Sequence, residues 1–161
     1  MALDKQRVFD AFRDAQQQVL DDLERGQDAA REGTRVDGSH RPVNRGERGA
    51  VTSQGYLAAG LAARLAELVA HLETLGQMDA GPRVQVGPGA LLELAEDDGP
   101  PAWYALLPGG LGSRVVVDDV EVMVLSPASP LAVALAGARA GDTVEVARRG
   151  RMVQVDVVAV S

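Results

Sequence analysis

The sequence predicts an α+β protein in which an N-terminal antiparallel coiled-coil helical hairpin precedes an antiparallel sheet domain with one short helix. Apolar residues recur at helical spacing between Asp4 and Gly76, whereas they alternate with polar residues after Gly89. Short apolar runs in the second half are separated by clusters of Gly, Pro and Asp, which are typical of turns between strands. A chain of 161 residues has room for two small units of this kind.

The first predicted element is a long helix from Asp4 to Glu32. Its apolar residues recur at spacings of three or four, which places them on one face of a helix. They are Val8, Phe12, Ala15, Val19 and Leu23, with charged residues between them. Gly33 is expected to end the helix, because glycine is favoured just past a helix end.

A second helix is predicted from a repeat of leucines at heptad-like spacing. The repeat consists of Leu57, Leu61, Leu65, Leu68, Leu72 and Leu75. Thr52 or Ser53 is expected to cap its start, and Gly76 follows its end. Each of the two helices is apolar along one stripe only. The expected arrangement is therefore an antiparallel hairpin in which the two stripes bury each other.

The segment between the two helices carries no apolar periodicity. Residues 34–51 hold several glycines and a proline among polar residues, so we expect a loop at the tip of the hairpin. A second segment rich in glycine and proline, residues 79–89, is expected to be a linker. The predicted domains are therefore residues 1–78 for the hairpin and residues 90–161 for the sheet domain.

The sheet domain is predicted from six short alternating runs. These runs are Leu91–Ala95, Trp103–Leu107, Arg114–Val117, Glu121–Leu125, Thr143–Ala147 and Met152–Val160. Turn signals such as Asp97-Asp98-Gly99-Pro100 separate them. A curved antiparallel sheet wrapped on a single helix is the expected architecture.

The single helix of this domain is predicted directly after Ser129. Ser129 is a helix N-cap, and Pro130 takes the first helical position, where its missing N–H has no helical partner to lose. Gly137 is expected to end the helix. Gly141-Asp142 then turns the chain into the next strand.

The composition excludes several classes of protein. The chain has no cysteine, which excludes disulfides and thiolate metal sites. Its net charge of −7 argues against direct, non-specific binding to nucleic acid, which needs a basic surface. The first residues lack an apolar signal core, and no apolar stretch reaches membrane-spanning length. We therefore expect a soluble cytoplasmic protein that does not bind membranes.

Several stretches of the sequence follow the motifs of one bacterial protein family. The strongest is Ser126–Val146, which follows the pattern "SPL…AL.G…GD.VEV". Trp103-Tyr104 followed by Leu107-Pro108 resembles the first hairpin of a shorter subfamily. Tyr56-Leu57-Ala58 resembles the opening of the second helix in those relatives. The chain thus resembles a divergent short member of the Gre transcript-cleavage factors of bacteria, the GreA/GreB family.

The resemblance implies an FKBP-like C-terminal domain without prolyl isomerase activity, and RNA polymerase as the partner. In the family, this domain docks at the rim of the polymerase secondary channel, and the coiled-coil arm enters the channel. Docking is therefore expected to involve Ser129, Pro130 and Leu131. The resemblance further implies a monomer that contacts RNA and DNA only indirectly, within the elongation complex.

In cleavage-competent Gre factors the chemistry resides in a "D-x-x-E-N" loop at the tip of the arm. Its two carboxylates help to hold a second Mg²⁺ at the polymerase active centre, which activates water to cut backtracked RNA. Counted back from Tyr56 without gaps, this motif falls on residues 40–44. Only Asn44 matches, because His40 and Val43 occupy the two acidic positions.

The tip is positively charged instead. Residues 31–48 contain five arginines and three acidic residues, a net charge of +2, which repels Mg²⁺. The residues expected to contact the polymerase active centre are His40, Arg41, Asn44, Arg45 and Arg48. We expect a regulator of elongation or initiation that does not strongly stimulate cleavage. The chain itself is expected to be no enzyme and to hold no cofactor, with Mg²⁺ involved only if the polymerase active site shares it.

Three alternatives stay open at this point. Asp37 and Glu47 lie close to the motif, and a small gap in the alignment would place either of them at one of its acidic positions. Under this alternative the chain is an active cleavage factor. The tip is also explained as a solvated loop that is rich in arginine for solubility. The alternative of another class is an FKBP-like prolyl isomerase or chaperone, although only 3% of the residues are aromatic and such a pocket is normally lined by several rings.

Overall fold

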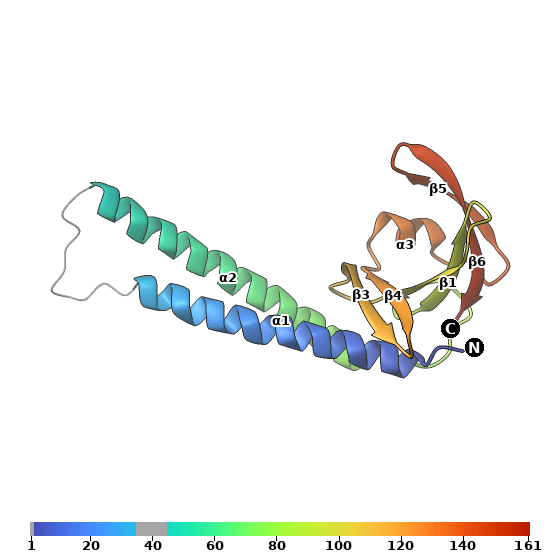
Figure 1. The fold of residues 1–161 in the computed structure, drawn as a ribbon, viewed down its shortest axis with the longest axis horizontal. Helices are drawn as coiled ribbons and strands as arrows, with labels where there is room; N and C mark the ends of the chain where they lie inside the picture. Colours follow the sequence, from blue (N-terminus) through green and yellow to red (C-terminus); the bar gives the residue numbers. More distant parts are fainter. Residues whose placement is uncertain (1, 35–44) are drawn as a thin grey trace. The chain divides into compact units, whose positions relative to one another are not determined.

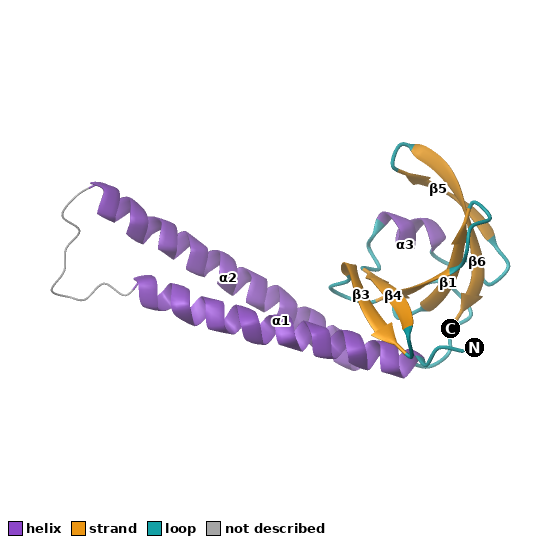
Figure 2. Ribbon diagram, viewed as in Figure 1, coloured by secondary structure: helices purple, strands orange, loops and turns teal. Residues whose placement is uncertain are grey.

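The computed structural model describes residues 2–34 and 45–161, and its contacts divide the chain into two compact units. One unit is Met1–Asp14 with Glu73–Ser161, and the other is Ala15–Leu72. The described elements, in chain order, are α1 (Lys5–Thr34), α2 (Arg45–Gln77), β1 (Leu91–Glu96), β2 (Ala102–Leu106), β3 (Leu111–Val117), β4 (Val120–Leu125), α3 (Pro130–Leu135), β5 (Thr143–Arg148) and β6 (Arg151–Val160) (Figure 1). Two long helices thus precede a sheet domain with one short helix (Figure 2). This confirms the predicted α+β class.

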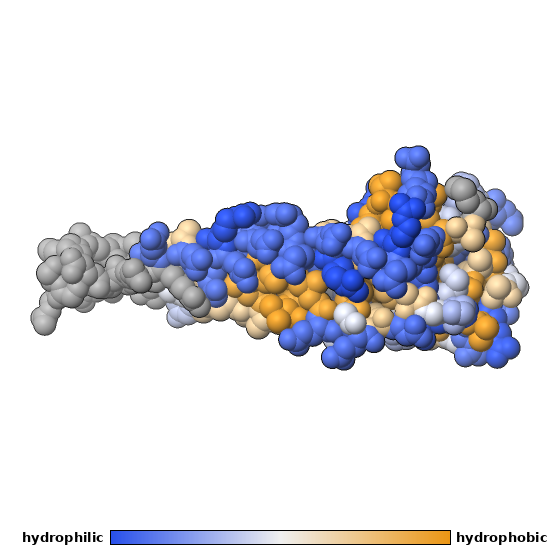
Figure 3. Space-filling model, turned by 90° about the horizontal axis from the view of Figure 1, so that it is seen from below, coloured by the Kyte–Doolittle hydropathy of each residue, from blue (hydrophilic) through white to orange (hydrophobic). Residues whose placement is uncertain are grey.

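In the helical unit, α1 and α2 lie side by side and pack through leucines (Figure 1). The buried members are Leu20, Leu65 and Leu68, with Leu23 and Leu72 partly buried against them. Val19 and Leu57, which belong to the predicted apolar stripes, are exposed. On the face drawn in Figure 3, a hydrophilic band runs beside an apolar band along the helical unit. The two stripes therefore bury each other over only part of their length.

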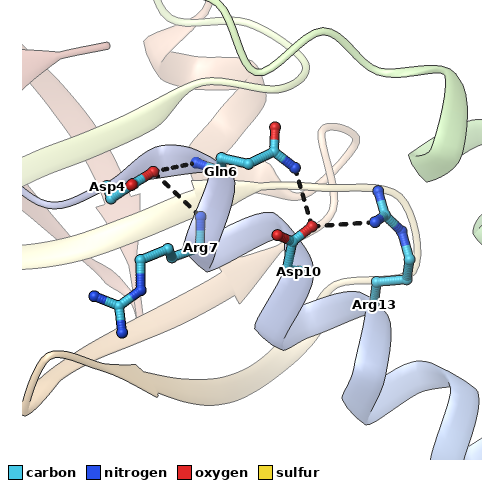
Figure 4. Close-up of polar contacts among 5 residues, drawn as sticks. All are labelled: Asp4, Gln6, Arg7, Asp10 and Arg13. Atoms are coloured by element: carbon cyan, nitrogen blue, oxygen red, sulfur yellow. Dashed lines mark hydrogen bonds and ion pairs between the residues drawn. The ribbon is translucent and has the colours of Figure 1, made fainter.

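The ends of the helices differ from the predicted bounds. α1 begins after Asp4, whose carboxylate Oδ1 accepts hydrogen bonds from the backbone N–H groups of Gln6 at 2.9 Å and Arg7 at 3.3 Å (Figure 4). This is an N-cap. α2 begins at Arg45, ahead of the predicted cap at Thr52 or Ser53. Glycines in this segment suggested a loop, but a helix accepts a glycine at a cost of only about 1 kcal/mol.

The first turns of α1 pack against the sheet. Val8, Phe9 and Phe12 are at most 1% exposed. They form one cluster with side chains from α2 and from or beside strands β1 to β4, namely Leu75, Leu91, Ala105, Leu107, Val115, Val117, Val122 and Val124. The prediction that the stripe of the first helix is buried by the second helix alone is wrong here. Spacing identifies the buried face of a helix, but it does not identify what covers that face.

The strands form one sheet in the order β3-β4-β2-β1-β6-β5. The sheet is antiparallel as predicted except for β2 and β4, which are parallel. β3 and β4 form a hairpin through Asp118-Asp119, both in the left-handed region at φ 51° and 61°, a conformation that aspartate tolerates better than most residues. β4 thus pairs antiparallel with β3 on one side and parallel with β2 on the other.

The inner strand β2 is buried on both of its faces. Tyr104 and Leu106 belong to a core that also contains Leu131 and Leu135, one residue near each end of α3. Ala105 belongs to the opposite core, which holds the first turns of α1. Successive side chains of a strand point to opposite faces, so a strand covered on both sides reads as a continuous apolar run. This packing holds α3 against one face of the sheet. The candidate site lies on that face.

Lys5, the first residue of α1, is buried within the sheet unit. The residue is 7% exposed, and its Nζ donates a hydrogen bond of 2.8 Å to the carbonyl oxygen of Gly81. The same Nζ lies 5.8 Å from the centre of the Phe9 ring. Burial, and then repulsion by Arg83, lowers the pKa of Lys5 to about 8, although Asp79 acts in the opposite direction.

This lowered pKa predicts that the sheet unit gains stability as the pH rises from about 8 to 10. In that window the unfolded chain still binds a proton at Lys5, whereas the folded chain has released it, so the free energy of unfolding increases with pH. Urea unfolding of the full chain at pH 7.5 and pH 9.5 measures the change. Lys5→Gln should remove the increase, whereas Arg114→Gln, at an exposed position of β3, should keep it. An equal increase in Lys5→Gln would contradict the prediction.

Candidate functional site

The segment that leads into α3 is held by capping hydrogen bonds. The Oγ of Ser129 accepts a hydrogen bond from the backbone N–H of Ala132 at 3.3 Å, and Pro130 takes the first helical position. At the other end, Gly137 lies in the left-handed region at φ 80° and its N–H donates to the carbonyl of Val86 at 2.9 Å. The predicted helix and its two ends are confirmed. An N-cap of this kind stabilises a helix by about 1 kcal/mol.

A turn before the cap is fixed by a second serine. The Oγ of Ser126 accepts a hydrogen bond from the backbone N–H of Ala128 at 3.2 Å. Its carbonyl accepts another from the backbone N–H of Ser129 at 2.9 Å. A serine that bonds to the backbone two residues ahead stabilises a turn. Residues 126–132 therefore form one continuous hydrogen-bonded surface segment.

The three residues predicted to dock differ in how they are buried. Leu131 is 7% exposed and packs into the core beside α3. Pro130 is exposed and Ser129 is partly buried. Val133, which sequence reasoning did not select, is 62% exposed and shares a face of the helix with Pro130, three residues before it. Leu131 therefore anchors the segment, while Pro130 and Val133 are accessible to a partner.

Two shallow hollows flank this segment. One, of about 310 Å³, lies between the start of α3 and the end of β5, and the other, of about 370 Å³, lies beside the β2–β3 turn. Leu125 and Ser129 line both. Leu111, which lines the second hollow, is 74% exposed. Large exposed apolar side chains beside hollows are typical of protein interaction surfaces. We call residues 126–133 with these two hollows the α3 surface.

A third hollow, of about 390 Å³, was not predicted from the sequence. It lies between the β1–β2 turn and the β5–β6 hairpin, and Tyr104 is part of its lining. Arg148 and Arg149 line this hollow and also the one between α3 and β5. The sequence signal was Arg148-Arg149-Gly150-Arg151, which holds three of the five arginines after Val84. Only the fold shows that this basic turn faces a cavity.

The residues predicted at the tip of the arm are only partly within the described chain. Asp37, His40, Arg41 and Asn44 lie outside the described residues. The remaining three, Arg45, Glu47 and Arg48, belong to the first turn of α2. Their predicted contacts with a polymerase active centre therefore stay predictions.

Two negative findings concern the described part of the chain. Within residues 2–34 and 45–161, no three His, Asp or Glu residues come together in a way that could hold a metal ion. Among the helices described, none is long and apolar enough to cross a membrane.

Comparison with known proteins gives a match for the second half of the sheet domain. The family model "Transcription elongation factor, GreA/GreB, C-term" matches residues 114–161, a range that contains α3 and its capped entry. This confirms the family resemblance over that range. No curated protein matches the chain.

Three solved structures are similar to the chain. GreA factor homolog 1 (Gfh1) of Thermus thermophilus is 19% identical, with 92% of this chain and 94% of that chain covered and a TM-score of 0.37. A structure of the transcription factor Gfh1 is 22% identical, with 93% of each chain covered and a TM-score of 0.38. Gfh1 of Thermus aquaticus is 21% identical, with 91% and 92% covered and a TM-score of 0.38.

Proposed function

We propose, from the match of the GreA/GreB C-terminal family model to residues 114–161, that the chain binds RNA polymerase. Its sheet domain docks at the rim of the polymerase secondary channel, and its helical hairpin enters the channel. The chain acts as a cytoplasmic monomer and contacts RNA and DNA only indirectly. The observation that carries this proposal is the match of the family model to the segment around α3.

The α3 surface is the docking site in this proposal. Its backbone is fixed by the hydrogen bonds of Ser126 and Ser129, so little conformational entropy is lost when a partner binds. Pro130 and Val133 present apolar atoms on one exposed face, and the flanking hollows offer places for partner side chains. Ser129 and Leu131 support this surface from within.

Charge inserted at this surface should weaken binding to the polymerase. Val133→Glu is expected to raise the Kd for core polymerase at least about tenfold, because the partner would have to desolvate an unpaired carboxylate. Fluorescence anisotropy of the labelled full chain at moderate salt measures the Kd. Val116→Glu is the matched control, because Val116 is 65% exposed on β3 and lines neither hollow of the α3 surface; it should bind like wild type. If the wild-type chain did not bind polymerase, the proposed function would be wrong. If both variants lost the same affinity for polymerase, the α3 surface would not be the docking site.

The tip of the hairpin regulates transcription in this proposal rather than stimulating RNA cleavage. His40 and Val43 stand where the cleavage motif has its acidic pair. Arg41, Arg45 and Arg48 instead favour contact with the acidic groups and phosphates of the polymerase active centre. The chain supplies charge and shape to the polymerase and performs no reaction of its own.

The tip sequence does not fit a metal site of its own. Mg²⁺ takes oxygen ligands and is usually held by carboxylates, and residues 31–48 offer three acidic residues among five arginines. The proposed function therefore includes no step that uses a metal held by this chain. If Mg²⁺ takes part, it belongs to the polymerase active site.

The two alternative functions differ in their support. In an active cleavage factor, Asp37 or Glu47 would have to supply a carboxylate of the cleavage motif. Substitution of these two residues tests that alternative. A prolyl isomerase of the FKBP type gains no support from the hollows described. The hollow at the β5–β6 hairpin contains one aromatic ring, that of Tyr104, and the hollows of the α3 surface contain none. Trp103 is partly buried on the opposite face of the sheet.

A further inference from the structure

The hollow at the β5–β6 hairpin opens at one end of the core beside α3. Leu94, Tyr104 and Val153 belong both to that core and to the lining of the hollow. Its volume of about 390 Å³ lies within the range of small-ligand pockets in proteins, about 300–1,000 Å³. The hollow is therefore large enough for a small molecule and has an apolar floor.

Charged residues replace apolar ones at the strand ends that border this hollow. Leu94 of β1 and Val146 of β5 are buried in the core beside α3. Glu96 and Arg148 follow two residues later on the same strands, and they share the face of Leu94 and Val146 because side chains alternate. The inner face of the sheet thus changes from apolar to charged where the hollow begins.

Only some of the charged side chains around the hollow form ion pairs with one another. Arg148 forms an ion pair with Glu96. Arg151 lies 3.7 Å from Asp97, and 75% of its side chain is exposed. Arg149 makes no ion pair with any described residue. The lining holds three arginines and one glutamate, a net charge of +2, in a chain whose net charge is −7.

The floor of the hollow includes Tyr104, which carries a hydroxyl. Tyr104 is 8% exposed, yet no described residue forms a hydrogen bond with its phenolic oxygen. Burial raises the pKa of this phenol, so the hydroxyl keeps its proton and is available as a donor. Among the described residues, only Arg83 has a fully buried side-chain polar atom without a partner, so the Tyr104 hydroxyl reaches the open space of the hollow, where it can donate to solvent or to a bound ligand.

A purely structural explanation, in which a salt bridge covers the end of the core, accounts for the presence of Glu96 and Arg148. It does not account for Arg149 and Arg151, which border the same hollow. Guanidinium groups pair with carboxylates and phosphates through parallel hydrogen bonds. An apolar floor with one donor, below a rim of arginines, suits an anion that carries an apolar group.

We propose that this hollow binds a small organic anion. The carboxylate or phosphate of the ligand pairs with Arg149 and Arg151 at the rim. Its apolar part lies against Leu94 and Tyr104, and the Tyr104 hydroxyl donates a hydrogen bond to it. Arg148 and Arg149 also line one hollow of the α3 surface, but the test of this site requires no polymerase.

Titration of the full chain with phenyl phosphate and with benzoate, followed by backbone amide NMR shifts, tests the site. We expect saturable shifts in residues 94–104 and 148–153, and the stronger of the two ligands identifies the anionic group. The double variant Arg149→Gln, Arg151→Gln should weaken binding about tenfold or more, because it removes charge-assisted hydrogen bonds. Tyr104→Phe, which removes only the hydroxyl, should weaken it about fivefold.

Matched controls separate this site from general attraction of anions. Arg114→Gln removes an arginine that lies outside the hollow and 3.4 Å from Glu121, and it should bind like wild type. Benzyl alcohol has a similar ring without an anionic group and should bind at least about tenfold more weakly. The amide spectrum shows directly whether each variant is folded. Absence of saturable shifts with both anions, or equal binding by the double arginine variant, overturns the proposal.

Discussion

Phe12→Ala is expected to lower the free energy of unfolding of the sheet unit by about 3–5 kcal/mol. Phe12 lies on α1, is 0% exposed and shares a cluster with Phe9 and with strands of the sheet. The substitution removes a large apolar surface and leaves a cavity that these neighbours fill only in part. A loss of this size is a large fraction of the stability of a typical small protein.

Urea unfolding monitored by the fluorescence of Trp103, the only tryptophan of the chain, measures this loss. Trp103 is partly buried against the same cluster as Phe12, so its signal reports on the unit concerned. Val19→Ala is the control on the same helix. Val19 is 40% exposed, and its truncation should cost less than about 1 kcal/mol. If Phe12→Ala cost no more than Val19→Ala, α1 would not pack on the sheet in solution.

Reversal of the tip charge is expected to abolish the effect of the chain on transcription. The triple variant Arg41→Glu, Arg45→Glu, Arg48→Glu changes the net charge of residues 31–48 from +2 to −4, since each substitution changes the charge by two. A negative tip is repelled by the phosphates and acidic groups of the polymerase active centre. Binding through the α3 surface should change less than about threefold, while the effect on the elongation rate should fall at least about tenfold.

A stalled, backtracked elongation complex distinguishes regulation from cleavage in the same experiment. With the wild-type chain, the RNA is expected to keep its length, because His40 and Val43 replace the acidic pair. RNA shortening that disappears in Asp37→Ala or Glu47→Ala would instead establish the active cleavage factor. Asp28→Ala is the control for these variants, because Asp28 is an exposed acidic residue of α1 outside the motif region.

The strands of the sheet domain were largely predictable from alternation. The predicted run Thr143–Ala147 corresponds to β5, and Met152–Val160 corresponds to β6, each within one residue at its ends. Alternation fixes the local conformation because each strand must present one face to a core. It carries no information on which strands become neighbours, so the parallel pairing of β2 with β4 appeared only in the fold.

The two long helices were predictable from the sequence, but the side chains that they contact were less so. The leucine repeat correctly indicated a long helix, and Leu65 and Leu68 are buried where α1 and α2 pack. The same reasoning assigned Val8 and Phe12 to the hairpin stripe, whereas they pack on the sheet. A helix stripe reports that a face is buried, and any apolar surface of suitable shape can bury it.

The sequence by itself determined the order of the elements, the capped helix after Ser129 and the family resemblance carried most strongly by Ser126–Val146. The family model, which matches residues 114–161, confirms the resemblance over that range. These features depend on residues close together in the chain, where caps, turns and periodicity act. Only the tertiary structure decided that Leu131 is internal while Val133 is accessible, and that Arg149 borders the same hollow as Tyr104. Burial and cavities arise from contacts between distant segments, and no local pattern of residues specifies those contacts.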